Sequence, residues 1–114
     1  MAKPNPNATA LNLPPLDPLP EATQKYFDVC DDKLGMIPNV LAAYAFDVDK
    51  LNSFTAMYND LMLGDSALIK LEREMIEVAV SSDNICYDCL VAHGAAGREL
   101  ALKFNVSRPI LREA

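Results

Sequence analysis

The sequence has no tryptophan, one histidine, four glycines and three cysteines. Its longest uninterrupted apolar run, Val40 to Phe46, is far shorter than the roughly 20 residues that a membrane span needs. It also lacks any run of basic residues, and 10 Lys and Arg against 16 Asp and Glu give a formal net charge of −6. The sequence therefore argues against a membrane-spanning protein. It also argues against nucleic-acid binding, because phosphate contacts need clustered cations.

The first fifteen residues lack a basic segment followed by an apolar core, which is the pattern of a secretory signal. We therefore expect a cytoplasmic protein. In that compartment three cysteines indicate reduced thiols, a metal site or redox chemistry rather than a disulfide framework. A chain of 114 residues has the length of one domain or of part of one.

Six of the eight prolines lie within the first twenty residues. Proline removes a backbone donor and fixes φ, so this segment cannot be a helix. We expect residues 1–19 to form an extended arm. The arm is either a free tail or a segment that packs on a partner subunit, and four leucines give it apolar side chains to bury there: Leu11, Leu13, Leu16 and Leu19.

Residues 20–114 are expected to form one all-α domain of five or six helices. Apolar spacing and capping signals place helices at about 20–34, 38–46, 47–63, 67–80 and 85–104. Ser107 and Pro109 resemble the start of one more helix, so we expect either that the domain is truncated at its C-terminus or that a partner chain supplies the missing packing. No segment alternates apolar and polar residues as a half-buried strand does.

Two of these helices have apolar faces that the spacing defines. The face of the 47–63 helix consists of Leu51, Phe54, Met57, Tyr58 and Leu61. The face of the 67–80 helix consists of Leu68, Leu71, Met75, Val78 and Ala79, and Glu72 falls within this arc. A glutamate on a core face is usually paired or functional, because burying a charge alone is costly.

The chemistry is concentrated in eight residues that hold Cys86, Cys89 and His93. On a helix these three side chains point to one side. We expect Cys86 in the first turn, where free N–H groups and the helix dipole lower the pKa of a thiol. The Cys-x-x-Cys spacing lets both sulfurs approach disulfide geometry, and His93 can exchange a proton with Cys89. We interpret the set as an attacking thiol, a resolving thiol and an acid–base group.

Two other interpretations fit the same residues. Cys86, Cys89 and His93 could supply three ligands to zinc, although a structural site needs a fourth. The thiols could also be passive, as small apolar side chains in a non-catalytic assembly domain. Cys30 lies on the apolar face of its own helix and is expected to be structural.

A proton relay needs a carboxylate near His93, and the preceding helix offers three. Glu72 falls inside the apolar arc, Glu74 lies on its edge, and Glu77 points the other way. Charge burial alone therefore leaves Glu74 and Glu72 as the two candidates.

The spacing Glu74-x11-Cys86-x2-Cys89-x3-His93 resembles the signature of alkylhydroperoxidase D-like proteins, in the carboxymuconolactone decarboxylase superfamily. The surrounding LEREMIEVAVSSDNICYDCLVAHGAA is similar to the branch of peroxidase-related enzymes. Residues 36–40 and 57–62 are similar to that branch as well. The resemblance covers roughly residues 20–104.

The resemblance implies an antioxidant thiol peroxidase or dithiol oxidoreductase. Cys89 would attack the hydroperoxide, Cys86 would resolve it as a Cys86–Cys89 disulfide, His93 would activate Cys89, and Glu74 would orient His93. A dithiol protein or lipoyl-type donor would then reduce the disulfide. The family implies a homo-oligomer, a trimer or hexamer, and neither a cofactor nor a metal. Asp88 stands where some members have histidine, and its charge should raise the pKa of the thiols.

Overall fold

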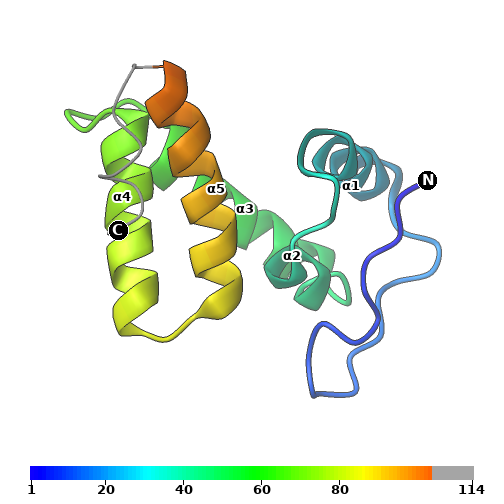
Figure 1. Cartoon of the computed structure of the whole chain (residues 1–114). Coiled ribbons are helices and arrows are strands. Elements are labelled where there is room, and N and C mark those ends of the chain that lie inside the picture. The colour runs from blue at the N-terminus through cyan, green and yellow to red at the C-terminus, as the bar shows by residue number, and fades with distance from the viewer. Residues whose placement is uncertain (104–114) are drawn as a thin grey trace. The chain divides into compact units, whose positions relative to one another are not determined.

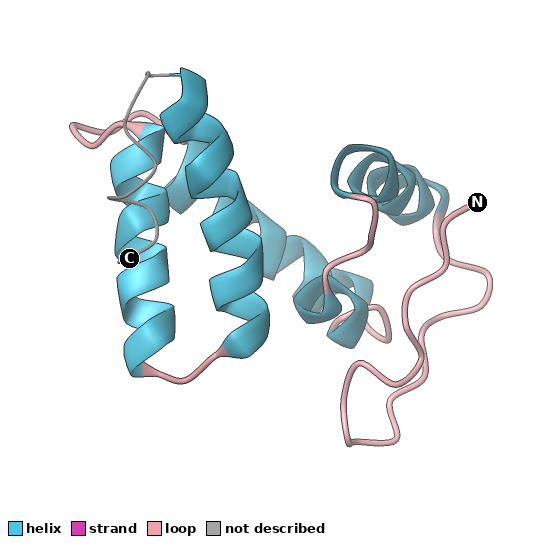
Figure 2. Cartoon of the chain, in the orientation of Figure 1, coloured by secondary structure: helices cyan, strands magenta, loops and turns pink. Residues whose placement is uncertain are grey.

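The computed structural model describes residues 1–103 and contains, within them, five α-helices and no strand (Figures 1 and 2). The all-α prediction is confirmed, while the further helix expected after Ser107 lies outside the described residues. No helix among residues 1–103 is long and apolar enough to cross a bilayer. The helices are α1 (Glu21–Leu34), α2 (Asn39–Ala43), α3 (Val48–Leu63), α4 (Lys70–Asp83) and α5 (Tyr87–Lys103).

The chain divides into two compact units, Met1–Met57 and a second that begins at Tyr58. The first unit has its own apolar core, in which Phe27 of α1 and Leu51 of α3 are fully buried. Leu41 of α2 also belongs to this core. The first unit therefore buries one face of each of its helices against the other two, which amphipathic spacing favours.

Helix α1 lies within one residue of its expected bounds. Its first turn is closed by a 2.9 Å hydrogen bond from the backbone N–H of Gln24 to the carbonyl of Pro20, so Pro20 precedes the helix. Gly35 ends it with a φ of 72°, and its N–H donates to the carbonyl of Asp31 at 2.8 Å. Glycine adopts this left-handed conformation without the steric cost that a Cβ brings.

The N-terminal arm contains neither helix nor strand in residues 1–20 and contacts its own unit. The backbone N–H of Ala2 donates to a carboxylate oxygen of Asp28 at 2.7 Å, and the Gln24 amide donates to the Ala2 carbonyl at 2.7 Å. Further along, the N–H of Leu16 donates to the carbonyl of Ala45 at 2.9 Å. Within this chain the arm is therefore held by hydrogen bonds to α1 and to the segment after α2.

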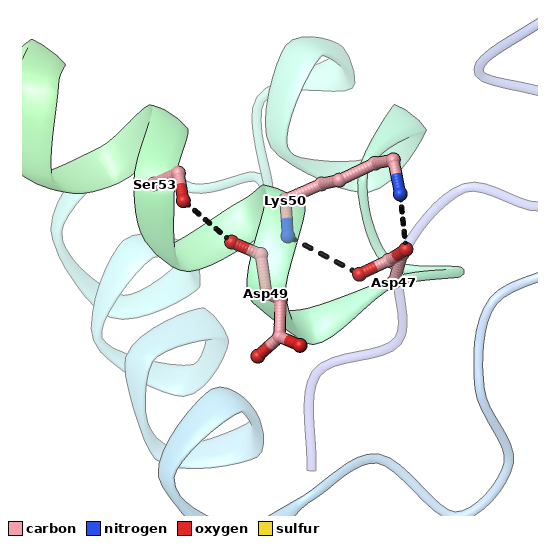
Figure 3. Close-up of polar contacts among 4 residues, drawn as sticks. All are labelled: Asp47, Asp49, Lys50 and Ser53. Atoms are coloured by element: carbon pink, nitrogen blue, oxygen red, sulfur yellow. Dashed lines mark hydrogen bonds and ion pairs between the residues drawn. The ribbon is translucent and has the colours of Figure 1, made fainter.

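Asp47 caps α3 (Figure 3). Its carboxylate accepts a hydrogen bond from the backbone N–H of Lys50 at 3.2 Å and forms an ion pair with the Lys50 ammonium. The hydrogen bond from the Lys50 side chain is the main reason that the pKa of Asp47 is lowered. In the next turn, the Ser53 hydroxyl donates to the Asp49 carbonyl at 2.9 Å.

Helices α4 and α5 lie side by side as a helical hairpin in the second unit (Figure 1). Gly97 of α5 is buried opposite α4, where an added Cβ would lie 3.6 Å from the Cβ of Glu74. Ala101, one turn further, is also buried. Small residues at these two positions let the α5 backbone approach α4 closely, and this approach positions the candidate site.

Three of the expected helix bounds were wrong. Helix α4 begins at Lys70 rather than at residue 67, because the Glu72 carboxylate accepts a 2.9 Å hydrogen bond from the N–H of Ile69 and caps the helix there. It ends at Asp83 rather than at residue 80, so the polar residues Ser81, Ser82 and Asp83 are helical. Helix α2 ends at Ala43, three residues before its expected end.

Candidate active site

The turn between α4 and α5 sets the position of the two thiols. Ile85 has a φ of 55°, in the left-handed region, and the N–H of Cys86 then donates to the carbonyl of Ser81 at 2.9 Å. The carbonyl of Cys86 accepts the N–H of Leu90 at 3.0 Å, so Cys86 stands at the cap of α5. The first turn of α5 therefore holds Cys89, and the expectation that Cys86 lies in that turn was wrong by one position.

Cys86 and Cys89 form a disulfide, with an S–S distance of 2.05 Å and a Cα–Cα distance of 5.3 Å. Both residues are half-buried. Cys89 lies in the first turn of α5, where backbone N–H groups have no acceptor within the helix. These groups and the helix dipole favour a thiolate at this position.

His93 lies one turn after Cys89 and contacts a carboxylate on the other helix of the hairpin. Its Nδ1 lies 2.7 Å from Oε2 of Glu74, and both side chains are largely buried, with exposed fractions of 14% and 12%. The hydrogen bond to Glu74 raises the pKa of His93 above the ordinary value of 6.5. Burial lowers that pKa in part, and the charges of Glu74 and Glu77 raise it further. The contact therefore favours the imidazolium form.

The other two candidate carboxylates lie elsewhere. Glu72 is exposed and caps the start of α4 through its bond to Ile69. It is therefore not the buried carboxylate that its position on the apolar arc suggested. Asp88 is exposed in the first turn of α5, next to Cys89 in the chain. The geometry thus brings Glu74, and not Glu72, to the histidine.

Tyr58 of α3 also contacts His93, and the sequence did not assign it to the site. The centroids of the two rings are 6.1 Å apart, and the ring planes are inclined at 42°. In the sequence Tyr58 was only one member of an apolar helix face, and nothing in its spacing relates it to a histidine 35 positions later. Only the packing of α3 against the hairpin reveals this contact.

Cys30 lies in the first unit and is buried, as expected for a structural thiol. Burial is the main cause that raises its pKa, which keeps the thiol protonated and unreactive. The zinc interpretation finds no support in the arrangement of side chains: within residues 1–103 no three His, Cys, Asp or Glu side chains are grouped as metal ligands.

Solved structures that are similar to the chain include two peroxidase-related proteins. Over 89% of its length it is 69% identical to an uncharacterized peroxidase-related protein from Silicibacter sp. TM1040, with a TM-score of 0.77. Over 75% of its length it is 43% identical to an alkylhydroperoxidase AhpD core protein, an uncharacterized peroxidase-related protein from Ralstonia eutropha JMP134, with a TM-score of 0.67. The sequence matches no protein-family model, and a search of curated proteins found no match.

The chain spans about half the length of the structures that it matches, 52% of the Silicibacter protein and 45% of the Ralstonia protein. The similarity therefore concerns only part of each of those proteins.

Proposed function

Because this chain belongs to the AhpD-like, peroxidase-related family, we propose that it reduces hydroperoxides through the Cys86–Cys89 pair. The observation that carries the proposal is the arrangement at the start of α5. Two cysteines that form a disulfide lie there, and Cys89 lies one turn before His93, which is bonded to the largely buried carboxylate of Glu74. This arrangement brings a nucleophile, a resolving group and an acid–base group together on two neighbouring helices.

The reaction has two steps in which the atoms balance. The Cys89 thiolate attacks one oxygen of the hydroperoxide, the O–O bond breaks, and Cys89 becomes a sulfenic acid while the alcohol leaves with a proton. The Cys86 thiol then attacks the sulfur of that sulfenic acid, and the hydroxyl group leaves as water. The product is the Cys86–Cys89 disulfide that this structure contains.

His93 is proposed to supply and accept the protons of these steps. Its Nδ1 is committed to Glu74, so Nε2 is the nitrogen that exchanges a proton with Cys89 or with the leaving alkoxide. Glu74 has the role of orienting the imidazole and stabilising its charged form, because a carboxylate bonded to one ring nitrogen fixes the tautomer. The raised pKa of His93 suits a group that must donate a proton to a departing oxygen.

Reduction of the disulfide requires a second substrate. We propose a dithiol protein or a lipoyl-type donor, which would open the disulfide by thiol–disulfide exchange.

We also propose that the chain forms a homo-oligomer. Supporting this are exposed apolar side chains on α4, among them Met75, Ile76 and Val80, which a monomer of this length leaves in contact with water.

The test is peroxide turnover by purified protein with dithiothreitol as the reductant. Cys89→Ser should abolish turnover and the first oxidation step. Cys86→Ser should abolish turnover but still form one sulfenic acid per chain, which dimedone traps. His93→Ala should slow oxidation of Cys89 by about 10²–10⁴. Cys30→Ser is the matched control and should retain activity. Full turnover by the Cys86→Ser/Cys89→Ser double variant would refute the proposal.

A further inference from the structure

The imidazole of His93 is in contact with side chains from two other helices. Glu74 of α4 binds its Nδ1 at 2.7 Å, and the ring of Tyr58 of α3 lies 6.1 Å from it, centroid to centroid. The charged groups that act on the imidazole, Glu74 and Glu77, both come from α4. Tyr58 is a neutral side chain beside this base, and the proposed mechanism gives it no part.

The two contacts constrain different degrees of freedom of the imidazole. A single hydrogen bond at Nδ1 fixes that atom but leaves the ring able to rotate about the bond. A second ring at 6.1 Å with a tilt of 42° falls within the range of favourable aromatic pairs and restricts this rotation. Holding the imidazole at the Glu74 carboxylate also favours its charged form, because the hydrogen bond to Glu74 is the main cause that raises the pKa of His93.

We propose that Tyr58 is a positioning residue for His93, whose aromatic ring holds the imidazole in the orientation that meets Glu74 and stabilises its protonated form. The catalytic consequence rests on the proposed peroxidase function, whereas the effect on His93 itself does not. In this proposal the aromatic ring, and not the hydroxyl, acts on His93. Phenylalanine at position 58 should therefore preserve the effect on His93, and an aliphatic residue should not.

The test uses the full chain and the fact that His93 is its only histidine. In an NMR titration the ring protons of a single histidine report its pKa without assignment. Tyr58→Leu and Tyr58→Met should each lower the pKa of His93, and Tyr58→Phe should leave it close to the wild-type value. Tyr44→Leu is the matched control, because it removes a half-buried tyrosine from a stacked pair with Phe54 in the first unit. It should leave the titration unchanged.

The kinetic readout is the pH profile of Cys89 oxidation by hydrogen peroxide. Tyr58→Leu and Tyr58→Met should slow this step by about threefold to tenfold at neutral pH. Tyr58→Phe should keep the rate of the wild-type protein. Circular dichroism establishes whether the variants are folded. Tyr58→Met provides a second aliphatic variant if leucine packs poorly, because the flexible methionine side chain adapts to irregular spaces.

Two results would overturn the inference. One is an unchanged titration of His93 in folded Tyr58→Leu and Tyr58→Met. The other is an equal loss in Tyr58→Phe, which would assign the effect to the hydroxyl. Absence of peroxide turnover in the wild-type protein would instead refute the proposed function, and the NMR titration would still decide the role of Tyr58.

Discussion

Nδ1 of His93 on α5 lies 2.7 Å from Oε2 of Glu74 on α4, although the two residues are 19 positions apart in the chain. The bond exists only when the two helices are packed together, since neither helix alone brings the groups within reach. Formation of the hairpin and formation of the candidate acid–base pair are therefore the same event.

Glu74→Gln should lower the pKa of His93 towards the ordinary value, because the bond to Glu74 is the main cause of its rise. Glu77→Gln should lower it less, because Glu77 acts on the imidazole only through its charge. An NMR titration of the single histidine measures both changes. A larger effect of Glu77→Gln would contradict the geometry.

Glu72→Ala should destabilise the protein by about 1 kcal/mol, because it removes the carboxylate that caps the Ile69 N–H at the start of α4. Urea denaturation measures this loss. The rate of peroxide reduction should stay at the wild-type level, since Glu72 is exposed and its bond is to the backbone. If Glu72→Gln slows the reaction more than Glu74→Gln, Glu72 and not Glu74 is the relay carboxylate.

The His93–Glu74 pair should make stability depend on pH in a known direction. The pKa of His93 is raised in the folded state, so the folded state binds the proton more tightly than the unfolded chain. The resulting stabilisation is complete below the unfolded value of about 6.5 and is lost as the pH rises through the folded pKa. The difference in free energy of unfolding between the oxidised wild type and His93→Gln should therefore shrink from pH 6 to pH 9. A difference that grows from pH 6 to pH 9 would contradict a raised pKa of His93 in the folded state.

Asp88→Asn should make Cys89 of the reduced protein more reactive. The carboxylate adjoins the thiol in the chain and opposes the effect of the helix N-terminus, so removing its charge should lower the pKa of Cys89. Alkylation by iodoacetamide at pH 7 should become about twofold to fivefold faster. Glu99→Gln, a similar change at an exposed position near the other end of α5, is the control and should have no effect. An unchanged alkylation rate would show that Asp88 does not govern the thiol.

Ile85→Asn should stabilise the protein by about 1 kcal/mol. Ile85 is 88% exposed and has a φ of 55°, a conformation that is costly for a β-branched residue and tolerated by asparagine. The free energy of unfolding in urea measures the gain. Ile76→Asn, at an exposed position inside α4, should bring none. A loss of stability in Ile85→Asn would mean that the Ile85 side chain makes contacts worth more than the strain.

Helix bounds could be predicted where one strong local signal acts. Gly35 ends α1 and Asp47 caps α3, and both bounds lie within one residue of the expected positions. The start of α4 was wrong because two caps compete: the Ser66 hydroxyl accepts the N–H of Leu68 at 3.1 Å in a turn, while Glu72 caps the helix three residues further on. A local rule cannot rank two such signals, since the packing of the helix selects between them.

The buried faces were less predictable than the bounds. On α3, Met57 and Leu61 were expected on the apolar face and are exposed, whereas Leu51 is buried as expected. On α4, Met75 is partly exposed and Glu74 is largely buried. An apolar arc identifies the face that benefits most from burial, but the neighbouring helices of the structure determine which part of that face is covered.

The sequence alone determined that Cys89 and the only histidine lie one turn apart on one helix, because 3.6 residues per turn place positions 89 and 93 on one side. Only the tertiary structure decided that Glu74 meets His93, that Glu72 serves as a cap, and that Tyr58 lies against the imidazole. The reason is physical. Contacts within one helix follow from its fixed geometry, whereas contacts between helices depend on how closely they pack, which small residues such as Gly97 control.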